Sequence, residues 1–146
     1  KKAKDVAGRC KSGIVIGADT VVLSGRRIIT KPKNIKDAAR TLKLLSQKPQ
    51  WVYTGLAVID IVGKKIFTDH EKTKIYMRRL GESEIRGYFR KVSPLDKAGS
   101  FDIQGIGGLF VDRIEGCFYN VVGLPLAKLR KMLVKAGVDI FDESVN

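Results

Sequence analysis

An aspartate and a lysine in the first third of the chain have side chains suited to phosphate chemistry. Asp19 follows an apolar run at residues 13–18, which predicts a strand buried on both faces and ending at this aspartate. A carboxylate held there can act as a general base or bind a metal ion, although aspartates are also common in turns. Lys31, beside Pro32, offers a mobile charge for phosphate or is an ordinary surface lysine. We expect the two to line one cleft.

A second group of polar residues lies in the glycine-rich stretch at residues 96–108. Asp96 and Lys97 begin the stretch, and Gln104 precedes its last glycines. Glycines let a backbone approach a ligand closely and turn N–H groups toward anionic oxygens. The stretch matches neither the phosphate-binding loop nor the dinucleotide fingerprint, so by itself it also fits a plain turn.

The elements that must position these residues follow from hydrophobic patterning. Strands and helices alternate without a strict strand-helix-strand repeat, which favours an α/β fold with a mixed sheet and flanking helices. Helices are predicted at residues 1–8, 35–45 (with Asn34 as N-cap), 82–92 and 124–135, and strands at 13–18, 21–23, 27–29, 51–62, 65–77 and 109–114, with 21–29 forming a hairpin and 51–77 an antiparallel pair.

Composition indicates one globular domain. The chain has 146 residues, of which 44% are hydrophobic, and a net charge of +13 that is spread along the sequence. Such charge either attracts polyanions or simply forms a solvated basic surface. Cys10, Cys117 and His70 lack the spacing of zinc ligands. With no signal peptide or membrane-spanning stretch, we expect a cytoplasmic protein with reduced thiols.

Several motifs in order resemble the Maf family across nearly the whole chain. They are Ile-Gly-Ala-Asp-Thr-Val-Val at 16–22, Thr-Lys-Pro at 30–32, Leu-Leu-Ser at 44–46, Val-Tyr-Thr-Gly at 52–55, Asp-Lys-Ala-Gly-Ser at 96–100, Ile-Gln-Gly at 103–105 and Asn-Val-Val-Gly-Leu-Pro at 120–125. The resemblance implies an inosine-triphosphate-pyrophosphatase-like fold, in which helices surround an elongated mixed sheet and two lobes enclose a nucleotide cleft.

The resemblance also implies an activity, which is conversion of a nucleoside triphosphate to the monophosphate and pyrophosphate with magnesium or manganese. Asp19 matches the family's proposed proton acceptor, which activates the attacking water, and it is a candidate metal ligand. Lys2, Lys31 and Lys97 match basic positions that would hold phosphates. Asp96 would serve beside them as a metal or hydrogen-bonding partner.

Thr20 and Gln104 match the positions that separate branches of the family. Together they resemble the branch that acts on dTTP and UTP, and we extend this to modified pyrimidine nucleotides. An amide such as that of Gln104 can both donate to and accept from a pyrimidine edge.

Family members begin with a strand and a Ser-x-Ser-x-Arg-Arg loop that would precede Lys1. We therefore expect residues 1–146 to form one Maf-like domain, N-terminally truncated, without the arginines that would bind the triphosphate. This leaves open a non-catalytic nucleotide-binding regulator, because the family is also associated with inhibition of septum formation. A basic nucleic-acid-binding module is a third alternative, although we expect no stable nucleic-acid complex and no membrane association. The resemblance also suggests a homodimer.

Overall fold

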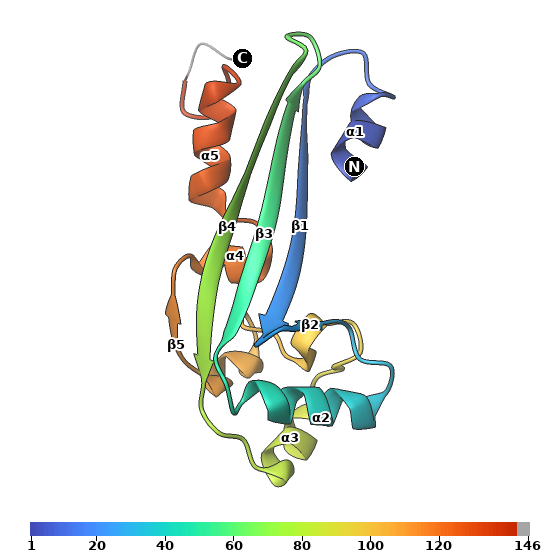
Figure 1. Ribbon diagram of the computed structural model, residues 1–146, viewed down its shortest axis with the longest axis vertical. Coiled ribbons are helices and arrows are strands. Elements are labelled where there is room, and N and C mark those ends of the chain that lie inside the picture. The colour runs from blue at the N-terminus through green and yellow to red at the C-terminus, as the bar shows by residue number, and fades with distance from the viewer. Residues whose placement is uncertain (143–146) are drawn as a thin grey trace.

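The computed structural model describes residues 1–142 of the chain (Figure 1). Its helices are α1 (Lys2–Ala7), α2 (Ile35–Leu45), α3 (Glu82–Phe89), α4 (Phe118–Val122) and α5 (Leu126–Lys135). Its strands are β1 (Ile14–Ser24), β2 (Arg27–Ile29), β3 (Gln50–Asp60), β4 (Lys65–Met77) and β5 (Val111–Glu115), and the 3-10 helices η1 (Ala98–Ser100) and η2 (Ile106–Phe110) lie between α3 and β5.

The strands within residues 1–142 form a sheet in the order β2-β1-β3-β4-β5, and every neighbouring pair is antiparallel. The predicted combination of helices and strands is confirmed, whereas the mixed sheet is wrong for these residues. Tight turns at 25–26 and 61–64 return the chain beside the strand just completed. Such turns produce antiparallel neighbours, since a parallel pair needs a long crossover.

The first strand is longer and more exposed to solvent than predicted. β1 runs without a break through Asp19, which lies opposite Gly55 in the middle of the pairing with β3. The predictions of a strand end at Asp19 and of burial on both faces are therefore wrong. Thr20 and Val21 favour extended backbone, so no residue there breaks the strand.

The helix at residues 35–45 is confirmed, including its cap. The Asn34 side chain accepts a hydrogen bond of 2.9 Å from the Asp37 N–H. Other boundaries differ from the predictions: α3 ends at Phe89 and α5 begins at Leu126. The last strand starts at Val111 because η2 occupies the preceding residues.

Buried side chains gather toward opposite ends of the long strands. Figure 1 shows α2 and α3 at one end of β1, β3 and β4, and α5 beside the other end. Among the described residues, one core cluster contains Leu42, Leu80, Ile85, Tyr88 and Phe110, and another contains Leu56, Val58, Leu129, Met132 and Leu133. None of the helices in residues 1–142 is long and apolar enough to cross a membrane.

Candidate functional site

Adjacent residues of β1 place their side chains on opposite faces of the sheet, and this divides the predicted site residues. Thr20 lines a pocket of about 270 Å³ together with Lys97 and Gln104. Asp19 lies with Lys2 in a separate groove, on the face that α1 covers. Lys31 lines neither of these two cavities. The described residues thus bring the predicted specificity pair together with Lys97, one of the lysines predicted to bind phosphate. They do not place Asp19 beside that pair.

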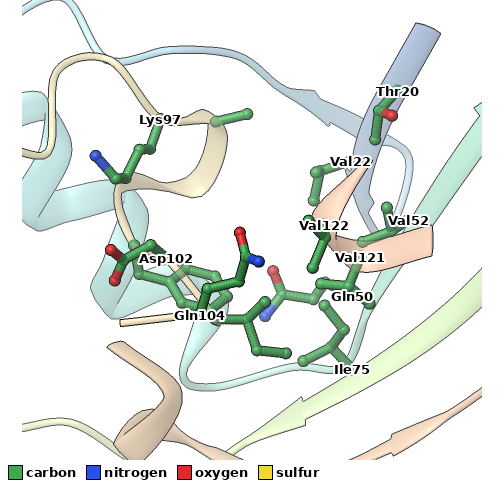
Figure 2. A pocket seen from close by; sticks show the side chains of 13 residues that line it. Thr20, Val22, Gln50, Val52, Ile75, Lys97, Asp102, Gln104, Val121 and Val122 are labelled. Atoms are coloured by element: carbon green, nitrogen blue, oxygen red, sulfur yellow. The ribbon is translucent and has the colours of Figure 1, made fainter. Parts of the chain in front are cut away.

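The pocket beside Thr20 combines an apolar wall with polar side chains from the glycine-rich stretch (Figure 2). The wall comes from β1, β3, β4 and the segment that contains α4, whereas the polar groups come mainly from residues 97–104. The lining residues are Thr20, Val22, Gln50, Val52, Ile75, Lys97, Ala98, Phe101, Asp102, Ile103, Gln104, Val121 and Val122. This combination is suited to a flat, partly apolar ligand with a few polar atoms.

The Thr20 hydroxyl is positioned by a chain of hydrogen bonds. Its Oγ1 lies 2.8 Å from Oγ1 of Thr54, which donates a 3.3 Å bond to the carbonyl oxygen of Asn120. A hydroxyl has one proton, so Thr54 must accept from Thr20. Thr20 therefore turns its remaining lone pairs outward and can accept a hydrogen bond from a ligand.

Lys97, which lines this pocket, forms an ion pair with Asp96. The Lys97 ammonium lies 2.8 Å and 2.9 Å from the two carboxylate oxygens of Asp96. This hydrogen-bonded contact lowers the pKa of Asp96, and the charge of Lys31 lowers it further. Lys31 is thus within electrostatic reach of the pair.

The turn that follows the ion pair is fixed against α2. Gly99 has a φ of +79°, in the left-handed region that favours glycine. A Cβ at this position would lie 3.0 Å from Cδ1 of Leu45, so the backbone packs closely on the helix. Lys97 is therefore attached to a well-packed element.

Asp102 is a pocket residue that the sequence analysis missed. The Tyr88 hydroxyl donates a 3.0 Å hydrogen bond to its carboxylate and accepts a 3.2 Å bond from its backbone N–H. Burial raises the pKa of Tyr88 to about 12, so the hydroxyl keeps its proton at neutral pH. The Gly107 N–H also donates to the Asp102 carboxylate, at 3.4 Å. An aspartate that precedes a run of glycines was the available signal, because it can organise the turn.

Asp19 and Lys2 face each other across the contact between α1 and β1. The Lys2 ammonium lies 3.7 Å from the Asp19 carboxylate, and both side chains are exposed. Gly17 allows this approach, because a Cβ there would lie 2.7 Å from Cβ of Ala3. Across residues 1–142, no group of three or more His, Cys, Asp or Glu side chains is placed to hold a metal ion.

Comparison with known proteins identifies relatives of the whole chain. The family model described as "Maf-like protein" matches residues 1–136. A "dTTP/UTP pyrophosphatase" from Methanosarcina barkeri is 46% identical over 146 residues, which cover 100% of this chain and 74% of the relative. Two further proteins of the same name are each 44% identical to this chain, and each match covers 96% of it. The match covers 72% of the relative from Caldicellulosiruptor saccharolyticus and 73% of the relative from Pelotomaculum thermopropionicum. The motifs at Asp19 and Asp96 lie within the matched residues, and the chain belongs to the Maf family.

Proposed function

We propose that this protein hydrolyses dTTP and UTP, and modified pyrimidine triphosphates, to the monophosphate and pyrophosphate. The observation that carries the proposal is the similarity, over 96–100% of the chain, to relatives named dTTP/UTP pyrophosphatases. The pocket formed by Thr20, Lys97 and Gln104 supports it, because its size and mixed lining suit a pyrimidine base.

We propose that a single nucleotide reaches both groups of site residues around the edge of β1. Within residues 1–142, β2 pairs only with residues 22–24 of β1, so this edge has no strand partner from residue 14 to residue 21. With the base in the Thr20 pocket, the phosphates would cross this edge, where Lys97 and Lys31 supply positive charge. Asp19 and Lys2 would then meet the triphosphate from the other face.

In this arrangement Asp19 acts as the general base. Its carboxylate would take a proton from water as the water attacks the α-phosphorus, and the ammonium groups would offset the charge that develops on the phosphates. Asp96 would keep Lys97 in place through their ion pair.

Asp19 is also the proposed protein ligand of a divalent ion, magnesium or manganese. Mg²⁺ binds through one or two carboxylates together with substrate phosphates and water. One exposed carboxylate at the sheet edge therefore fits an ion that is shared with the nucleotide. Such an ion would neutralise phosphate charge and help pyrophosphate to leave.

At the scale of the whole chain, we propose that the ends of the sheet, one carrying α2 and α3 and the other α5, correspond to the two lobes of the nucleotide cleft. The homodimer remains a prediction, for which sedimentation velocity is the test.

Pyrophosphate release from dTTP, UTP, CTP and GTP with magnesium tests the function. We expect turnover of dTTP and UTP, and a loss of at least about a hundredfold in kcat for Asp19→Asn. Asp112→Asn is the matched control, because Asp112 is an exposed residue of β5 and should leave turnover unchanged. An inert protein on all four nucleotides would refute the enzymatic proposal and favour the regulatory alternative. Full activity of Asp19→Asn would refute the assignment of the base.

A further inference from the structure

Gln50 is a buried amide that lines the Thr20 pocket and lacks a partner for its oxygen. The residue is 1% exposed, at the start of β3. Its Nε2 donates a 2.8 Å hydrogen bond to the sulfur of Met77, whereas its Oε1 accepts no hydrogen bond from the described residues. A buried amide oxygen without a donor is costly, so such a group in a cavity wall indicates that a donor is supplied there.

Gln104 is the neighbouring amide in the same pocket. It extends from the glycine-rich turn and is exposed. Figure 2 shows both amides pointing into the pocket, with the Gln104 nitrogen turned toward Gln50 and the Gln104 oxygen turned away from it.

A side-chain amide has a donor end, the NH₂ group, and an acceptor end, the oxygen. The orientation of one amide can therefore fix the orientation of a second amide that bonds to it. If the NH₂ group of Gln104 donates to Oε1 of Gln50, the Gln104 oxygen must face the ligand. That oxygen can accept from the N3–H of uracil or thymine. It would repel cytosine, which has an unprotonated acceptor at N3.

We propose that Gln50 is a positioning residue that holds the Gln104 amide in this orientation and so makes the pocket select pyrimidines with an N3–H donor. The inference rests on the proposed function and deepens it, because it explains how Gln104 separates UTP from CTP. Gln50 acts through Gln104, because the side-chain carbonyl of Gln50 accepts the hydrogen bond that orients the Gln104 amide.

Replacing Gln50 separates this role from a packing role. Gln50→Leu keeps the approximate size of the side chain but removes the acceptor, which leaves the Gln104 amide free to present either end. Gln50→Glu keeps an acceptor oxygen in either protonation state. Gln47→Leu, the same chemical change at an exposed glutamine after α2, is the matched control.

The readout is the ratio of kcat/KM for UTP to that for CTP. We expect Gln50→Leu to lower this ratio by roughly tenfold, the effect of one hydrogen bond, through a higher KM for UTP and a lower KM for CTP. The ratio should stay at the wild-type value in Gln47→Leu and near it in Gln50→Glu. Thermal melting of Gln50→Leu checks that the variant folds. An unchanged ratio in Gln50→Leu, or an equal loss in Gln50→Glu, overturns the inference while the proposed function stands.

Binding of the monophosphates tests the same inference without turnover. Isothermal titration with UMP and CMP should show a preference of the wild-type protein for UMP that Gln50→Leu loses. This result supports the role of Gln50 even if no triphosphate is hydrolysed. Equal affinity of the wild type for UMP and CMP overturns it, whether or not the variants fold.

Discussion

At the scale of single residues, the hydrogen-bond chain through Thr20 makes this hydroxyl an acceptor toward the pocket. Thr20→Val keeps the shape of the side chain but removes the hydroxyl, while Thr54 keeps its bond to the Asn120 carbonyl. We expect kcat/KM for UTP to fall roughly tenfold and stability to fall by about 1 kcal/mol. Steady-state kinetics and thermal melting check the two effects.

Thr20→Ser retains the hydroxyl and should retain most of the activity. If Thr20→Val were as active on UTP as the wild type, Thr20 would line the pocket without contacting the substrate.

Some residues of the candidate site were predicted from sequence motifs, and others were missed for physical reasons. Asp19, Thr20 and Gln104 belong to motifs with a fixed order along the chain. Gln50 and Asp102 have roles that depend on what surrounds them in space, namely an unpartnered oxygen in one case and the Tyr88 hydroxyl in the other. No spacing in the sequence reports such contacts.

At the scale of elements, the glycine-rich turn is shaped around Asp102. A Cβ at Gly107 would lie 2.4 Å from the backbone oxygen of Asp102, which cannot move without displacing the turn. Gly107→Ala should therefore lower the free energy of unfolding by about 1–3 kcal/mol and raise KM for UTP, because Gln104 is displaced. Urea denaturation and kinetics measure both.

Gly87→Ala is the matched control for that substitution. Gly87 lies in α3, and the nearest atom to an added Cβ is an Arg90 side-chain nitrogen at 3.8 Å. Alanine there should stabilise the helix by up to about 1 kcal/mol without changing KM. Normal stability of Gly107→Ala would mean that the turn is loosely packed.

The contact between Tyr88 of α3 and Asp102 of the glycine-rich turn also predicts how stability changes at alkaline pH. The folded protein raises the pKa of Tyr88 from 10.0 to about 12, through burial, so it holds this proton more tightly than the unfolded chain does. The stabilisation from Tyr88 is complete below about pH 10 and is lost as the pH rises toward about 12. The difference in urea midpoint between the wild type and Tyr88→Phe should decrease over this range. A constant difference would show that the hydroxyl is not shielded from water.

The elements themselves were predicted unevenly. The amphipathic period and the Asn34 cap determine α2 locally, and the structure confirms both. The continuity of β1 through Asp19 and the antiparallel order of the sheet depend on pairing with distant residues such as Gly55. Local patterns do not contain that information, so they predicted two short strands and a mixed sheet.

At the scale of the whole molecule, β3 and β4 run between core clusters that lie toward opposite ends of the sheet, so we expect both ends to unfold together. Trp51, the single tryptophan, lies at the end near α2 and reports on that end by fluorescence. Met132→Ala, in the core beside α5, should destabilise by about 2–5 kcal/mol. It should lower the midpoint of the Trp51 fluorescence transition as much as that of far-ultraviolet circular dichroism. Leu42→Ala, at the other end, should shift both signals in the same way.

Val134→Ala serves as the control for Met132→Ala, because Val134 is a neighbouring residue of α5 that is 44% exposed. It should leave both midpoints nearly unchanged.

If Met132→Ala shifted the circular dichroism midpoint but left the Trp51 transition in place, the two ends would be separate folding units. In that case the long strands would connect the Thr20 pocket to the α5 core, but the stability of one end would not depend on that of the other. Substitutions near α5 should then leave nucleotide binding unaffected. With coupled ends, the same substitutions weaken binding only at temperatures where the whole chain begins to unfold.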